Sequence, residues 1–138
     1  MGLETTTVPS GLVTTNPTSS DGISQGDDHL RLLKTVVQNL GKWVPGEWST
    51  DATTSLTAVA GKGYICTNGS AVTLTLPASP SAGDTVGVVF TNGLTTNVIS
   101  RNGSPICSTA ENMTVNANTS TMVLVLTYVD STRGWVLQ

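Results

Sequence analysis

The hydrophobic side chains of this chain repeat with two different periods, and this change limits its fold more than any other feature. Between Ser24 and Gly41 the apolar residues recur three and four positions apart, as they do along one side of an α-helix. From Ala52 onward they alternate at every second position, as in strands with one buried and one solvated face. The sequence therefore predicts a mainly β protein in which one amphipathic helix precedes the strands.

The two periods divide the chain into four predicted regions. Residues 1–24 are expected to form an extended arm, residues 25–41 an amphipathic helix for oligomerisation or attachment, residues 42–51 a linker, and residues 52–138 a β-sandwich domain. Pro17 disfavours helix in the arm, because a proline biases the residue before it toward extended conformations. Trp43 and Trp48 in the linker are expected to pack between the helix and the sheet.

The predicted helix has an apolar side and a polar side. At 100° per residue, its leucines and valines fall within an arc of about 160°, opposite the charged and amide side chains. Ser24 is placed to cap the amino end, and Gly41 is a suitable stop. Four residues of the apolar arc follow one another at the spacing that packs helices in a bundle, and they are Leu30, Leu33, Val37 and Leu40.

A helix of about 16 residues is marginal in water by itself, so its apolar side must be covered. Two covers are open on the sequence: other copies of the same helix, or the chain's own β domain. Self-association would use Leu30, Leu33, Val37 and Leu40. His29 falls inside the same arc and is expected to pack beside them as a buried histidine, without a metal.

The β region contains about eight short predicted strands separated by turn signals such as Asn68-Gly69, Asn92-Gly93 and Asn102-Gly103. The expected strands are Ser55–Val59, Tyr64–Thr67, Val72–Leu76, Thr85–Phe90, Asn97–Arg101, Asn112–Val115, Met122–Val129 and Gly134–Leu137. Such spacing is typical of an antiparallel β-sandwich or a small barrel. The strand from Met122 is apolar on both faces, which indicates a central position or a subunit contact.

Composition argues against several classes of function. The chain has six Lys and Arg residues and a net charge of -3, whereas nucleic-acid binding needs a cluster of positive charge. One histidine, two cysteines and isolated carboxylates offer little for catalysis, so we predict neither an enzyme nor a cofactor. No run approaches the roughly 20 apolar residues of a membrane span, so membrane insertion is not expected.

The two cysteines, Cys66 and Cys107, leave two alternatives open. Neither stands in a CxxC motif or beside a cation that would make it reactive, so we expect two separate buried thiols. The alternative is a disulfide between them, which would stabilise the domain by about 3–4 kcal/mol.

The run from Gly11 to Leu40 resembles the N-terminal region of many tail fibre proteins of tailed bacteriophages. The matching elements are Asn16-Pro17, Asp21, Gly26, Asp27-Asp28-His29, Arg31-Leu32 and Lys34. The β region also looks like small β modules of phage structural proteins, although this likeness is looser. In that family the segment attaches a trimeric fibre to the virion, so the resemblance implies a homotrimer docked through its arm. The residues assigned to docking are Leu12, Val13, Asn16, Pro17 and Ile23.

The sequence thus predicts a structural virion protein located in the tail. It would be a short trimeric tail fibre or fibre adaptor, bound to a tail hub, adaptor or portal-associated protein, with the β domain projecting toward the host. One alternative is a capsid decoration or head-fibre protein. Another is a receptor module that binds a host surface glycan by stacking a sugar ring on an exposed aromatic side chain, for which the candidates are Trp48, Tyr64, Tyr128 and Trp135.

Overall fold

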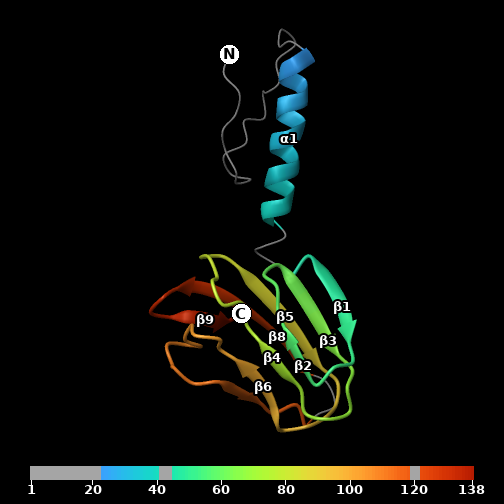
Figure 1. Cartoon of the computed structure of the whole chain (residues 1–138), viewed down its shortest axis with the longest axis vertical. Coiled ribbons are helices and arrows are strands. Elements are labelled where there is room, and N and C mark those ends of the chain that lie inside the picture. The colour runs from blue at the N-terminus through green and yellow to red at the C-terminus, as the bar shows by residue number, and fades with distance from the viewer. Residues whose placement is uncertain (1–22, 41–44, 119–121) are drawn as a thin grey trace. The chain divides into compact units, whose positions relative to one another are not determined.

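The computed structural model describes residues 23–40, 45–118 and 122–138 of the chain (Figure 1). The chain divides into two compact units, Met1–Gly41 and Lys42–Gln138. The described part of the first unit is one α-helix, α1, which spans Ile23–Leu40. The predicted helix is therefore present, but it begins at Ile23, so the last two residues assigned to the arm belong to it. The remaining residues of the predicted arm lie outside the described residues.

The second unit consists of short strands arranged in two mixed sheets, and the described residues contain nine strands. Their bounds are β1 Glu47–Asp51, β2 Ser55–Thr57, β3 Lys62–Cys66, β4 Thr73–Thr75, β5 Thr85–Phe90, β6 Asn97–Ser100, β7 Met113–Val115, β8 Met122–Asp130 and β9 Gly134–Leu137. The five-stranded sheet has the order β1-β3-β5-β8-β9, and the four-stranded sheet has the order β2-β4-β6-β7. The prediction of a mainly β protein is confirmed.

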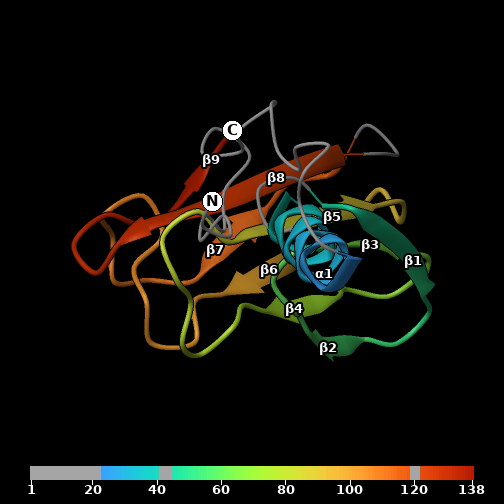
Figure 2. The ribbon, with the colours of Figure 1, turned by 90° about the horizontal axis from the view of Figure 1, so that it is seen from above.

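The first six strands alternate between the two sheets. Each strand from β1 to β6 lies in the opposite sheet from the strand before it, so β1, β3 and β5 become parallel neighbours, and so do β2, β4 and β6. Figure 2 shows the two sheets as separate layers. The chain therefore winds through both layers before β7, β8 and β9 add antiparallel strands at the far side of each sheet.

The predicted antiparallel arrangement is wrong for these six strands, and the sheets do not close into a barrel. Parallel neighbours need a crossover connection, which is usually a helix. Here the crossover from one strand to its parallel neighbour is a strand of the opposite sheet. Alternation of apolar and polar residues reports which face of a strand is buried, but it carries no information about the direction of the neighbouring strand.

Two Thr-Asn-Gly sequences form matching corners where the chain leaves the five-stranded sheet. They follow β3 and β5, whose last residues are register partners. Thr91 donates hydrogen bonds through its backbone N–H and its hydroxyl to the carbonyl of Cys66, at 3.3 and 2.9 Å. Thr67 donates in the same way to the carbonyl of Asp51. These turn signals therefore stack successive turns of the chain on one another instead of making hairpins.

The asparagines of these corners satisfy backbone carbonyls. Asn68 Nδ2 donates to the carbonyl of Ala52 at 2.6 Å, and Asn92 Nδ2 donates to that of Ser70 at 2.9 Å. Asn92 also exchanges side-chain hydrogen bonds with the buried Asn97. Since Asn97 Oδ1 accepts from the backbone N–H of Val72 as well, one fully bonded amide ties the residue that precedes β4 to β6. A buried amide is stabilising only when its partners are all present.

Strand β1 corrects the prediction that residues 42–51 form a linker. Glu47–Asp51 pairs along its whole length with β3, so Trp48 lies beside Gly63 in a sheet. Trp48 is the single large apolar residue of this strand, so the sequence carries no alternating pattern there. The edge position explains why so polar a strand is tolerated.

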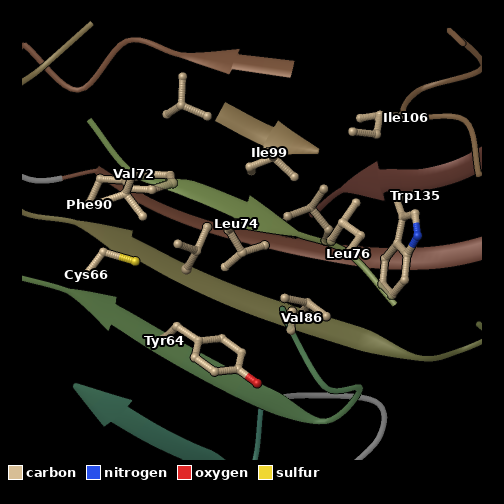
Figure 3. Close-up of a cluster of buried hydrophobic side chains, with 14 of the residues drawn as sticks. Tyr64, Cys66, Val72, Leu74, Leu76, Val86, Phe90, Ile99, Ile106 and Trp135 are labelled. Atoms are coloured by element: carbon tan, nitrogen blue, oxygen red, sulfur yellow. The ribbon is translucent and has the colours of Figure 1, made fainter. Parts of the chain in front are cut away.

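The hydrophobic core of the second unit lies between the two sheets (Figure 3). The five-stranded sheet contributes Tyr64, Cys66, Val86, Val88, Phe90, Leu126 and Trp135, and the four-stranded sheet contributes Leu74, Ile99 and Val115. Trp135 contacts Tyr128 edge to face, with ring centroids 5.6 Å apart. The core is therefore built from one chain.

Candidate assembly site

One side of α1 carries apolar side chains that are exposed in the described structure. Leu30 is 60% exposed, Leu33 48% and Val37 59%. Together with Lys34, these residues line an apolar hollow of about 360 Å³. Leu30, Leu33 and Val37 are all among the residues that the sequence predicts to form a bundle contact. We call Leu30, Leu33, Val37 and Leu40 the helix stripe.

The apolar arc of the helix divides into two parts. Val36 is buried and Leu32 is half-buried, and both lie at about 200–240° around the helix from Leu30. Leu33 and Val37 lie at about 300–340° on the same scale, and they are exposed. The exposed part therefore coincides with the residues at bundle spacing, and the covered part does not.

The polar side of the helix is held by local interactions. Arg31 Nη1 lies 3.7 Å from Asp28 Oδ1, and Thr35 Oγ1 donates to the carbonyl of Arg31 at 3.1 Å. The Arg31 side chain is largely exposed and that of Asp28 is nearly half exposed, so this ion pair contributes little to stability. The helix therefore gains most of its stability elsewhere, from whatever covers its apolar side.

Several predicted site residues, or their side chains, lie outside the part of the chain that the structure describes. The backbones of His29 and Leu40 belong to α1, but their side chains are not among the described ones. Of the predicted docking residues, Ile23 begins α1, while Leu12, Val13, Asn16 and Pro17 lie outside the described residues.

The alternative of a disulfide is wrong, because Cys66 and Cys107 are both free. Cys66 lies in β3 at one end of the core, whereas Figure 3 places Ile106, the neighbour of Cys107, at the other end. The expectation of two buried thiols is confirmed for Cys66 and wrong for Cys107, which is exposed. Cys107 and Ser108 both have positive φ, in a tight turn closed by two hydrogen bonds between Ile106 and Thr109.

Burial shapes the chemistry of Cys66. Loss of solvent, with the neighbouring Asp51 carboxylate as a second cause, raises the pKa of the Cys66 thiol to about 11. The protonated thiol is inert as a nucleophile and as a metal ligand at neutral pH. Cys66 is therefore a core residue.

Two carboxylates of the second unit, Asp51 and Asp130, accept local hydrogen bonds at strand ends. The hydroxyl of Thr53, followed by its backbone N–H, lowers the pKa of Asp51. The backbone N–H of Arg133 is the largest cause that lowers the pKa of Asp130, which also pairs with the Arg133 side chain at 2.7 Å. Within residues 23–40, 45–118 and 122–138, no group of three His, Cys, Asp or Glu residues is placed to hold a metal ion.

The four aromatic residues considered for glycan stacking differ in burial. Trp135 and Tyr64 are buried in the core, and Tyr64 uses its hydroxyl to accept a hydrogen bond from the backbone N–H of Val59 at 2.8 Å. Tyr128 is half-buried against Trp135. Trp48 is 41% exposed, so it is the member of this set with a surface available for contact.

Trp48 lies flat on the five-stranded sheet, a position that the sequence pattern did not predict. A Cβ at Gly63 would lie 2.4 Å from the middle of the indole, and a Cβ at Gly87 would lie 2.7 Å from its far end. The ring therefore spans from β3 to β5, over two strand positions where only glycine leaves room. Gly63 and Gly87 were the available signal, because a glycine inside a strand pattern often marks a close approach.

No protein-family model matches the chain, and no curated protein sequence shows significant similarity to it. In the described part of the structure, α1 is too polar to cross a bilayer and no other helix is present.

Proposed function

We propose that this chain is a subunit of a homotrimeric structural protein of a bacteriophage virion, a short tail fibre or fibre adaptor. The helix stripe holds three copies together, and the arm and helix attach the trimer to the tail. The β unit projects toward the host. The protein acts by assembly and does not catalyse a reaction.

The observation that carries this proposal is the exposure of the three described side chains of the helix stripe. Leu30, Leu33 and Val37 present a continuous apolar surface with about half of each side chain open to solvent. Soluble monomers rarely leave such contiguous apolar surface uncovered. Covering it with identical helices satisfies the bundle spacing of the stripe, since residues three and four apart lie on one face.

The resemblance of Gly11–Leu40 to phage fibre attachment regions supplies the biological setting of the proposal. An attachment segment of that kind joins a fibre to the tail, which supports a tail position over a head position. The capsid decoration or head-fibre alternative uses the same trimer at another site on the particle. Labelled protein located on virions by electron microscopy distinguishes the two positions.

A glycan-binding role is the second candidate, and Trp48 is the observation in its favour. Its indole is held flat on the sheet with one face outward, as sugar stacking requires. However, the adjacent register row on that face holds Ile65, Val89 and Val123, so Thr50 is the one side chain of that row that could hydrogen-bond to a sugar hydroxyl. We therefore rank contact with protein above contact with sugar, and a glycan array with Trp48→Ala as the control tests the ranking.

The proposal is tested by substituting Leu33 with Asp in the full-length chain. A charge at the centre of the stripe cannot be buried between helices, so the variant should become monomeric in light scattering and should not be incorporated into virions. The matched control is Thr35→Asp, which places the same charge at an exposed position on the polar side of α1.

The control should remain trimeric, and both variants should keep the circular dichroism and melting temperature of the β unit. A trimer that persists unchanged in Leu33→Asp would contradict the role of the helix stripe. Loss of the trimer in both variants would show that the helix tolerates no added charge, and it would remove the support for a specific contact.

A further inference from the structure

The outer face of the five-stranded sheet, which points away from the core, carries apolar and threonine side chains. Because successive residues of a strand point to opposite faces, the register that places Tyr64 and Val86 in the core places the odd-numbered residues of β3, β5 and β8 outward. The described side chains of this face are Trp48, Thr50, Ile65, Thr85, Val89, Val123, Val125, Thr127 and Val136, of which Thr85 is already buried within the single chain. None of these described side chains is charged.

The centre of this outer face is flat. Trp48 lies across Gly63 and Gly87, which form one register row with Val125 of β8. The next row brings Thr50, Ile65, Val89 and Val123 together, and Val123 is 59% exposed. A flat, uncharged and partly exposed sheet face is suited to packing against another face of the same kind.

The chain enters the second unit on this same face. Pro45 Cγ lies 2.9 Å from where a Cβ at Gly87 would be, so Pro45 covers the outer side of β5. Residues 41–44 alone separate Pro45 from the end of α1 at Leu40. Four residues therefore connect the helix to Pro45 on the outer face, so association of the helices would hold the β units of different copies within a short tether of one another.

The size of the face indicates what can occupy it. Five strands at about 4.8 Å spacing, with about five residues each at 3.3 Å, present on the order of 300 Å². A stable interface between independent proteins buries about 800 Å² on each partner, so this face is too small to hold a separate protein by itself. It is large enough for copies that are already joined, because a short tether raises their effective concentration to the millimolar range.

We infer that the outer face of the five-stranded sheet packs against the same face of the other copies in the trimer. This inference rests on the proposed assembly through the helix stripe, and it adds a second contact between the β units. The lack of charge on the face suits an identical partner, because no complementary charge is required. Trp48 and Val123 lie within this contact.

The experiment compares the reactivity of two engineered thiols in the full-length chain. Val123→Cys and Val59→Cys are made separately in a Cys107→Ser background, in which the buried Cys66 does not react. Val123 and Val59 are 59% and 55% exposed in the single chain, so they form a matched pair. Val59 lies between β2 and β3, outside the outer face. The rate of maleimide labelling is measured together with the molar mass.

We expect a trimer in which Val123→Cys is labelled at least about tenfold more slowly than Val59→Cys, since labelling requires the contact to open. Adding Leu33→Asp should give monomers in which the two rates become equal. Equal rates in a trimer would overturn the inference and leave the proposed function standing. Equal rates in a chain that is monomeric without Leu33→Asp would overturn both. Protection that survives in Leu33→Asp monomers would also overturn the inference, because the same chain would then cover the face.

Discussion

The helix and the β unit differ in how far their apolar side chains are buried. In the β unit, Leu74, Phe90 and Trp135 are fully buried between two sheets of the same chain. In the helix, Leu30, Leu33 and Val37 remain about half exposed. Because burial of apolar surface drives folding, the β unit has a core of its own, whereas in the proposed assembly the helix stripe would gain its stabilisation from association. The proposed function thus assigns folding and assembly to different parts of the chain.

The largest predicted effect is a difference in unfolding free energy between substitutions of two leucines, one in the β unit and one in the helix. Leu74→Ala should lower the free energy of unfolding of the β unit by about 2–5 kcal/mol, because it leaves a cavity in the core. Leu30→Ala should leave that free energy unchanged and should weaken self-association. Urea unfolding followed by tryptophan fluorescence measures the first quantity, and light scattering at several concentrations measures the second. Equal loss of β-unit stability in the two variants would mean that the regions are not independent.

The buried amide of Asn97 offers the next largest effect. Asn97→Ala removes its bonds to Asn92 and leaves the backbone N–H of Val72 without its acceptor, so the β unit should lose about 2–4 kcal/mol. Asn116→Ala is the control, because Asn116 is exposed and accepts one bond from Asn118. Chemical denaturation should show a change within about 1 kcal/mol for the control. A tolerated Asn97→Ala would contradict the assignment of this amide as the tie between β6 and the residue that precedes β4.

The thiol of Cys66 makes the stability of the β unit decrease with rising pH in the alkaline range. Its pKa is raised from the ordinary value of 9.0 to about 11, so the folded state holds the proton more tightly than the unfolded state. The contribution is fully present below pH 9 and is lost as the pH rises toward 11, by about 2 kcal/mol. The difference between the unmodified chain and Cys66→Ala, measured by urea unfolding from pH 8 to 11, isolates this part. A difference that does not change with pH would contradict the burial of the thiol.

The smallest effect concerns the glycines under Trp48. Gly63→Ala places a Cβ 2.4 Å from the indole, so the ring must lift from the sheet, at a cost of about 1–2 kcal/mol. Trp48 fluorescence should shift, and the contact between β units should weaken. Gly69→Ala is the control, because no atom lies within 4 Å of its added Cβ. Identical emission spectra for the two variants would show that the indole does not depend on Gly63.

Much of this fold could be predicted from its sequence. The bounds of Thr85–Phe90 and Gly134–Leu137 agree with the structure, because alternation within each run and turn residues at both ends leave little freedom. The direction of neighbouring strands could not be predicted, since the sequence separation of β3 and β5 does not reveal that the chain crosses to the other sheet between them. β1 was missed because its side chains lack an alternating pattern.

The candidate site was predicted only in part, because periodicity shows which side chains share a face of the helix but not what covers that face. Helical periodicity singled out Leu30, Leu33 and Val37, and the same three side chains are exposed in the structure. It could not show that Val36 is covered while they are not, because a periodic pattern gives no information about the surface that packs against the helix. The outer face could not be predicted either, since only the strand register brings Trp48, Gly63 and Val123 onto one face.

The most direct test is the molar mass of the unmodified full-length chain in a dilution series, followed by sedimentation equilibrium. Association through the helix stripe predicts a species of three times the 14.2 kDa chain mass that dissociates as the concentration falls. A species of one chain mass at every concentration, with α1 still helical by circular dichroism, would contradict the account, because the stripe would then be stable without a partner copy.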